Sequence, residues 1–347
     1  MLTTKTMEHH DSGSRKNRRL ALLLVLSPAA ALLIVTCSVL YGAKDIAPDD
    51  VWNALIYYDS GNVDHQIILH SRIPRAAGAL LVGLMLAMSG AVMQGVTRND
   101  LASPSLLGVS DGSVFAVTLC MILVPNVGGS GLILVSMAGS ALGVALVFGM
   151  AALIPRGSSP VTLAILGIIT GMFLNGVSDA LAMYYHIPQK ISFWYNARLY
   201  QMELGELEMV WPYALAGIIL VLLLSRYISV LALGEEVSAA LGQRVRLIKG
   251  ISMLAVALLT GIAVAIAGKI AFVGLIIPHV ARMIIGNDYR RVIPLSGALG
   301  ALFLGLCDIL SRFMNYPFEM PIGVVLAIFG VPFFLYLIRR RKKEVAS

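Results

Sequence analysis

Charged residues are scarce in this sequence of 347 residues. Asp, Glu, Lys and Arg make up 13% of the chain, hydrophobic residues make up 58%, and the mean hydropathy is +0.84. A soluble domain carries about 25% charged residues, so a water-exposed surface of ordinary composition is excluded. Several apolar runs also reach about 18 residues, the length that crosses roughly 30 Å of hydrocarbon. The sequence therefore predicts an integral membrane protein.

Cysteine is also rare, and its positions exclude a disulfide framework or a cysteine metal site. The three cysteines stand inside apolar runs without metal-type spacing, at Cys37, Cys120 and Cys307. We expect them to be small buried hydrophobic side chains.

Apolar runs and their breaks predict ten membrane-spanning helices and hence an all-α fold. The spans lie near residues 20–41, 76–96, 106–124, 131–154, 160–184, 209–228, 250–267, 272–286, 292–313 and 321–338. The first is long for a signal peptide and lacks a good cleavage site, so we interpret it as a retained span. This reading predicts a cytoplasmic tail at 1–19, a single transmembrane domain at 20–338 and a second tail at 339–347.

The net charge of +7 gathers near the two ends of the chain. Five basic residues precede the first span and five follow the last: Lys5, Arg15, Lys16, Arg18, Arg19, Arg339, Arg340, Arg341, Lys342 and Lys343. Cytoplasmic loops retain Lys and Arg, and ten spans return the chain to its starting side, so we expect both termini in the cytoplasm. No basic stripe is interleaved with aromatic residues, and no nucleic-acid partner is expected.

Some basic residues fall in loops predicted to lie outside the cell. A cation on that side needs a partner, an anionic ligand or a local carboxylate to explain it. These residues are Lys44, Arg72, Arg75, Lys190, Arg198, Lys269 and Arg312.

Two segments of the chain suggest an inverted internal repeat. Leu80–Gly90 aligns with Leu258–Gly268, and each places two glycines seven residues apart on one helix face. Such small-residue faces allow close helix packing, and oppositely oriented repeats are common in transporters. Chance similarity between glycine-rich spans is the alternative.

A short amphipathic segment lies between the sixth and seventh spans. In Leu233–Gly242 the apolar residues Leu233, Val237 and Leu241 recur every four positions, with glutamates beside them and Gly242 as a stop. A helix too short and too charged to span suits docking into a groove of another protein. A plain surface connector fits the periodicity equally well.

A series of motifs resembles the iron-siderophore and cobalamin permease family of ATP-binding-cassette (ABC) importers. The motifs are Arg72–Arg75, Gly90–Pro104, Leu106–Gly112, Leu233–Gly242, Phe272–Arg282, Met320–Val325 and Gly330–Phe334. They occur in order and cover roughly residues 70–338. The resemblance implies a ten-helix permease that pairs with a second copy or a paralogue, two cytoplasmic ATPase subunits and an extracytoplasmic substrate-binding protein.

The resemblance also implies roles for individual residues. The coupling segment, at about 229–249, would contact the ATPase through Leu233, Gly234, Glu235, Glu236, Val237, Ala240, Leu241 and Gly242. Arg72, Arg75 and Arg312 match positions whose arginines pair with glutamates of the binding protein. The alternatives are interfacial anchoring for Arg72 and Arg75, and an intrahelical pair with Asp308 for Arg312.

The chain carries no ATP-binding motif of its own. Gly268-Lys269 resembles part of a phosphate-binding loop, but Ala263 replaces the first glycine and Ile270 follows the lysine. We therefore expect no catalytic residue, metal or cofactor on this chain, with ATP and Mg on the partner ATPase.

Polar and glycine-rich positions inside the spans are candidates for the translocation path. We expect the path near Gly108, Ser110, Gly112, Gly171, Asn175 and Asp179, because irregular backbone in a membrane lines a cavity or packs on protein. Asp111, Asp308 and His279 are also intramembrane, and structural pairing is the favoured interpretation for them.

The function predicted is import of a ferric siderophore across the bacterial cytoplasmic membrane, without covalent chemistry. Cobalamin or haem would fit the same family. A secondary transporter driven by ions is the rival from another class, and it would need buried carboxylates without partners.

Overall fold

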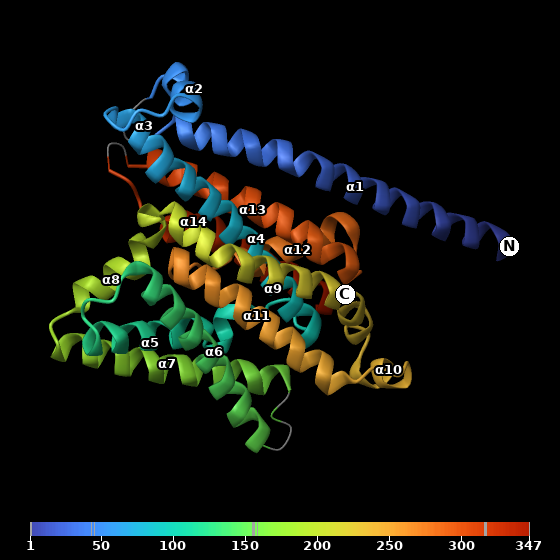
Figure 1. Ribbon diagram of the computed structural model, residues 1–347. Helices are drawn as coiled ribbons and strands as arrows, with labels where there is room; N and C mark the ends of the chain where they lie inside the picture. The colour runs from blue at the N-terminus through green and yellow to red at the C-terminus, as the bar shows by residue number, and fades with distance from the viewer. Residues whose placement is uncertain are drawn as a thin grey trace.

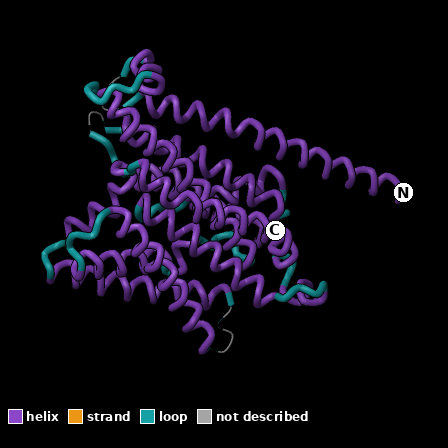
Figure 2. The backbone as a smooth tube through the Cα atoms, viewed as in Figure 1, coloured by secondary structure: helices purple, strands orange, loops and turns teal. Residues whose placement is uncertain are grey.

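The protein is helical throughout the part of the chain that the structure describes. The computed structural model describes residues 2–42, 44, 46–154, 157, 159–315 and 318–346. Over these residues the backbone forms helices joined by loops and turns, with no strand (Figure 2). The predicted all-α fold class is confirmed.

The ten predicted spans correspond in order to ten apolar helices of the described residues. Seven are long and apolar enough to cross a membrane, and three apolar stretches are shorter. The long ones are α1 (Leu2–Leu40, apolar from Lys16), α4 (Ile73–Thr97), α6 (Gly129–Leu153), α7 (Pro160–Tyr184), α9 (Leu204–Leu231), α11 (Val245–Ala267) and α13 (Tyr289–Phe313). The shorter ones are α5 (Val109–Leu123), α12 (Val273–Ile285) and the apolar part, Ile322–Leu337, of α14 (Ile322–Ala346).

Short helices mark the two ends of the bundle. Helices α2 (Pro48–Ile56), α3 (Val63–Ile67) and α8 (Pro188–Ala197) lie at one end, and α10 (Glu235–Ala240) lies at the other (Figure 1). The start of α1 points toward the α10 end, as an even number of spans requires. Helices α1 and α14 continue without a break through the predicted tail boundaries at 19/20 and 338/339.

Proline and side-chain caps explain where several helices begin. Pro48, Pro160 and Pro188 occupy the first turns of α2, α7 and α8, where a missing N–H costs nothing. Ser159 Oγ accepts from the amide of Thr162, and Asp288 Oδ1 accepts from that of Arg290. These signals are local, so the helix starts can be read from the sequence.

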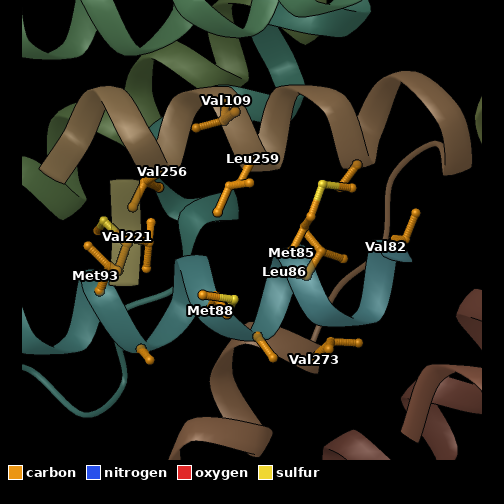
Figure 3. Close-up of a cluster of buried hydrophobic side chains, with 14 of the residues drawn as sticks. Val82, Met85, Leu86, Met88, Met93, Val109, Val221, Val256, Leu259 and Val273 are labelled. Atoms are coloured by element: carbon orange, nitrogen blue, oxygen red, sulfur yellow. The ribbon is translucent and has the colours of Figure 1, made fainter. Parts of the chain in front are cut away.

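Helices α4 and α11 form the centre of the bundle. Both are buried along most of their length and pack on each other. Figure 3 shows Met85 of α4 pointing toward α11, which carries Leu259, while Val221 of α9 lies near Met93 and Val273 of α12 lies on the other side of α4. Lipid tails are as apolar as these side chains, so close packing rather than the hydrophobic effect holds the helices together.

Glycines allow the closest contacts between helices. A Cβ on Gly83 of α4 would lie 2.2 Å from the carbonyl oxygen of Gly300 in α13, and one on Gly90 would lie 1.9 Å from that of Gly274 in α12. Any side chain at these two positions would push the helices apart. The small-residue face predicted for Leu80–Gly90 is therefore used for packing.

The helix contacts repeat between the two halves of the chain. Helix α4 packs on α12 and α13, and α11 packs on α5 and α6 in the same way. Likewise α5 packs on α6 as α12 packs on α13. Helix α4 starts at the α2 end and α11 starts at the α10 end, so the two run in opposite directions (Figure 1). This arrangement fits an inverted repeat about an axis between α4 and α11.

Candidate functional site

The predicted docking segment forms a single short helix, α10. It covers Glu235–Ala240 and is shorter than the predicted Leu233–Gly242. Gly234, with φ 132°, precedes it, and Gly242, with φ 81°, follows it. Side chains rarely adopt these backbone conformations, so the two glycines fix where α10 begins and ends.

Polar contacts attach α10 to α11 and to the turn before it. Ser238 is fully buried, and its hydroxyl donates to Gln243 Oε1 at 2.6 Å. The Gln243 amide donates back to the Ser238 carbonyl at 3.0 Å. Lys249 Nζ in α11 forms an ion pair with Glu235 Oε1 at 2.7 Å. The sequence analysis did not identify Ser238 or Gln243. The signal that could have indicated Ser238 is its position, as a small polar residue, on the helix face opposite the apolar one.

The described part of the chain leaves the apolar face of α10 uncovered. Leu233, Val237 and Leu241 are 69%, 45% and 66% exposed. The flanking Glu236 and Ala240 are also exposed. A contiguous apolar surface rimmed by charge is typical of a contact with another protein.

At the α2 end, Arg72 is buried and closes the end of α1. Its Nη1 donates to the carbonyl oxygens of Val39 at 2.5 Å and Leu40 at 3.1 Å, and its Nη2 donates to that of Lys44. The last carbonyls of a helix lack partners within the helix, and a guanidinium supplies them. Arg72 therefore joins the end of α1 to the start of α4. Its side chain is not extended toward the membrane–water interface.

Arg75 and Arg312 share one buried carboxylate. Asp308 is 1% exposed; its Oδ1 lies 2.8 Å from Arg75 Nε and its Oδ2 lies 2.5 Å from Arg312 Nη2. Arg75 also pairs with Glu319 Oε2 at 2.6 Å and lies over the Tyr200 ring, 4.2 Å from its centre. Arg312 Nη1 donates to the Ser38 carbonyl at 2.7 Å. The favoured intrahelical pair of Asp308 with Arg312 is present.

These contacts give each of the three predicted docking arginines an internal partner. Glu319 is the outermost carboxylate of the group, with a side chain 25% exposed. An external carboxylate would have to replace Glu319 to reach Arg75. Sequence reasoning missed Glu319 and Tyr200 because they lie far from Arg75 along the chain. The docking role of the arginines stays a prediction.

Three of the predicted path residues are buried between helices. Gly108, with φ 69°, begins α5, and Ser110 follows it in the first turn. A Cβ on Gly112 would lie 2.3 Å from the carbonyl oxygen of Gly139 in α6. In this conformation these residues pack α5 on α6 and α7 and do not line an open surface.

The other three predicted path residues lie on α7 beside a buried carboxylate, Asp111. Asn175 Nδ2 donates to Asp111 Oδ1 at 2.7 Å, and Lys269 Nζ donates to the same oxygen at 2.8 Å. Gly171 lets α7 approach, because a Cβ there would lie 2.4 Å from Asp111 Oδ2. Asp179 is exposed two turns further along α7 from Gly171. Asp111 thereby joins α5, α7 and the end of α11, and it explains Lys269, a cation on the predicted outer side.

The Asp111 cluster borders an exposed apolar face of α7. The hydroxyl of Tyr195, in α8, is buried near Asp111 and Asp179 and has no hydrogen-bond partner among the described residues. Burial raises the pKa of Tyr195 well above its usual value, and the two carboxylates raise it further. The face itself forms an open groove of about 570 Å³ lined by Met172, Phe173, Gly176, Val177, Ala180, Leu181 and Tyr184.

Two further cations of the α2 end also have carboxylate partners. Lys44 pairs with Asp64, and Arg198 forms a buried pair with Glu206. Of the three explanations that the sequence left open for these cations (a partner, an anionic ligand or a local carboxylate), the structure shows a local carboxylate for both.

Comparison with known proteins places this arrangement in a family. A sequence model of the FecCD transport family matches residues 30–340. The chain belongs to the FecCD transport family. The predicted resemblance is confirmed, and the helices described above are those of a transport permease.

Named relatives are similar over nearly their whole length. The iron-uptake system permease protein FeuB of Bacillus subtilis is 55% identical over 323 residues, which are 93% of this chain and 97% of that protein. The ferric enterobactin transport system permease protein FepD of Escherichia coli is 35% identical and covers 93% and 95% of the two chains. A solved structure of an inward-facing metal-chelate type ABC transporter matches with a TM-score of 0.78 at 27% identity, covering 92% of this chain and 99% of that one.

Proposed function

We infer that this protein is the permease through which a ferric siderophore enters a bacterial cell, powered by partner ATPases. The observation that carries the substrate class is the 55% identity to an iron-uptake permease across nearly the full length of both chains. Other relatives are named for iron-hydroxamate, ferric citrate and ferric enterobactin import. The common chemistry of these substrates is Fe(III) held by an organic chelator.

The assembly that we propose contains a second permease, two ATPase subunits and an extracytoplasmic binding protein. The α10 end faces the cytoplasm in this proposal, with both termini. The uncovered apolar face of α10 supports contact with an ATPase at this end. The ordered short helices α2, α3 and α8 would face the binding protein at the other.

Movement of α10 would reach the path through α11. The Ser238–Gln243 and Glu235–Lys249 contacts attach α10 to the start of α11. At the far end of α11, Lys269 bonds Asp111, which Asn175 of α7 also contacts. A shift of α11 therefore pulls on the helix that carries the exposed apolar groove. The chain does no covalent chemistry in this mechanism; it changes which side of the path is open.

The test is uptake by a reconstituted assembly. Vesicles containing this permease, its partner permease, the ATPase and the binding protein should accumulate radioactive iron as a ferric siderophore only when ATP is hydrolysed. Cobalamin and haem are assayed in the same vesicles. Uptake of either in place of the siderophore would refute the substrate, and uptake driven by an ion gradient without nucleotide would refute the mechanism.

The buried carboxylates support ATP rather than proton coupling. Asp111 is bonded to Lys269, and Asp308 to Arg75 and Arg312. An ion-coupled carrier would need buried carboxylates without partners, and both of these carboxylates have partners.

Docking of the binding protein can be tested without breaking the buried network. Reversing the charge of Arg75 would also disrupt Asp308, so its effect on docking would be ambiguous. Glu319→Gln removes only the outer partner of Arg75. If a glutamate of the binding protein takes that place, Glu319→Gln should strengthen docking severalfold, measured as the Kd by surface plasmon resonance. Weaker or unchanged docking would leave these arginines with a structural role alone.

A further inference from the structure

A basic cavity at the α10 end borders the Glu235–Lys249 pair, and the function proposed above places no ligand in it. Its volume is about 190 Å³, and it lies where α4, α6, α7, α10 and α11 meet. The floor is apolar and the rim is charged. The floor is lined by Val96, Phe148, Leu163 and Met253, and the rim carries Arg98, Glu235, Arg246 and Lys249.

The rim of the cavity has more cationic than anionic side chains. Glu235 pairs with Lys249 at 2.7 Å. Arg98 and Arg246 are exposed and have no ion pair with any carboxylate in the described part of the chain. Three cations and one anion leave an excess of two positive charges around the cavity.

Arg98, at the rim, has an unusual backbone conformation. It ends α4 with φ 51° and ψ 35°, a left-handed conformation that residues other than glycine seldom adopt. Its Nη1 lies 3.7 Å from where a Cβ on Gly234 would stand, next to the start of α10. The guanidinium thus lies between the cavity and the start of α10.

An apolar strip leads from the rim along the membrane-spanning part of α11. Leu247, Gly250 and Leu254 recur on one helix face, and Leu247 and Leu254 are 54% and 64% exposed. A Cβ on Gly250 would meet no atom within 4 Å, so the strip is open at that point. A free anion would use only the rim, whereas a molecule with an anionic head and an acyl chain would use the rim and the strip.

We propose that this cavity binds the headgroup phosphate of an anionic phospholipid, with an acyl chain along Leu247–Leu254. Arg98 and Arg246 contact the phosphate, and the lipid holds Arg98 in place beside α10. Basic pockets between helices at the cytoplasmic surface attract such lipids because that leaflet is negatively charged. The inference rests on the proposed function only in placing the α10 end at that leaflet.

The test is lipid retention by the full-length permease, with its co-purifying subunits, in nanodiscs of phosphatidylglycerol and phosphatidylcholine. Native mass spectrometry counts the phosphatidylglycerol that remains bound. The double variant Arg98→Gln, Arg246→Gln should lose one tightly bound molecule per permease. Its affinity should fall roughly 30-fold, as expected from about 1 kcal/mol for each basic residue near an anionic surface.

Two controls isolate the site. Arg226→Gln with Arg290→Gln removes the same charge from exposed arginines outside the cavity and should retain the lipid. Arg98→Lys with Arg246→Lys keeps the charge and should retain most of it, even if the Gln variant folds poorly.

Several outcomes would overturn the proposal. One is unchanged retention in the Gln variant, and another is equal loss in the outside-cavity control. Displacement of the lipid by inorganic phosphate would identify the ligand as a free anion. A Gln variant that kept the lipid but no longer bound the ATPase would assign the rim to a protein contact. None of these readouts needs substrate or transport, so failure of the iron-import proposal would leave them unaffected.

Discussion

At the residue scale, paired charges dominate the interior of this membrane protein. Asp308 lies between Arg75 and Arg312, and Asp111 lies between Lys269 and the Asn175 amide. A buried ion is costly without a partner, and removing one partner leaves the other uncompensated. These carboxylates therefore fix where α1, α4 and α13 meet and where α5, α7 and α11 meet.

Asp308→Asn tests the first of these groups. The substitution leaves the buried Arg312 guanidinium without a carboxylate and leaves Arg75 with Glu319 alone, and we expect a loss of about 3–5 kcal/mol in stability. Thermal unfolding in detergent, followed by tryptophan fluorescence, measures the change. Asp179→Asn, at an exposed carboxylate, should change stability by no more than about 0.5 kcal/mol. Equal melting temperatures for the two variants would contradict this account.

A double-mutant cycle tests the second group. Asp111→Asn and Lys269→Met remove one partner each, and the double variant removes both. We expect a coupling energy of roughly 1 kcal/mol, within the range found for residues in direct contact. It is smaller than a fully buried pair would give, because the Lys269 side chain is 48% exposed. Additive effects would mean that the pair does not stabilise the native state.

At the element scale, glycine decides which helices can touch. Gly83 and Gly112 face carbonyl oxygens of neighbouring helices, whereas Gly176 faces open space on α7. All three glycines lie in spans of similar composition. Only their neighbours distinguish a packing glycine from an exposed one.

Substitution of these glycines by leucine should therefore separate into two classes. Gly83→Leu and Gly112→Leu force helices apart and should reduce the yield of monodisperse protein and lower the melting temperature by many degrees. Gly176→Leu should retain both properties. Size-exclusion chromatography and thermal unfolding provide the measurement, and a folded, stable Gly83→Leu variant would show that α4 and α13 can separate at little cost.

Helix α10 is the element on which energy coupling depends. Glu236→Lys changes the exposed rim of α10 without touching a buried contact, so the permease should stay folded. We expect uptake to fall at least tenfold, because the reversed charge lies in the proposed contact with the ATPase. Docking of the binding protein, at the other end of the bundle, should be unchanged. Glu208→Lys makes the same change at the α2 end and should leave ATPase coupling intact. Normal uptake by Glu236→Lys would leave α10 as a surface connector.

At the scale of the whole molecule, the six predicted path residues divide between the interior of the bundle and an open face of α7. Gly108, Ser110 and Gly112 are buried within the subunit, whereas the α7 face beside Asn175 and Asp179 is open. A path between two permeases would use this open face. We therefore expect one chain to supply one wall of the path.

Cysteine accessibility in the assembled importer tests this placement. Asp179→Cys and Asn175→Cys should react with a water-soluble maleimide, at rates that change when ATP binds. Ser110→Cys should react slowly in every state, because its position is buried between helices. Fast labelling of Ser110→Cys with no labelling of Asp179→Cys would contradict this placement and would indicate a path on the other side of α5.

The sequence by itself determined the membrane class, the ten apolar spans and their order, and the family, because composition, run length and motif order are properties of the chain alone. It also indicated α10 and the pair of Asp308 with Arg312, since both are local along the helix. Only the tertiary structure decided the partners of Arg72, Arg75 and Lys269, and which predicted path residues are buried. Arg75 and Asp308 are 233 residues apart, and Lys269 and Asp111 are 158 apart. Such contacts form when helices that are distant in the sequence pack together, so the periodicity of a single segment cannot predict them.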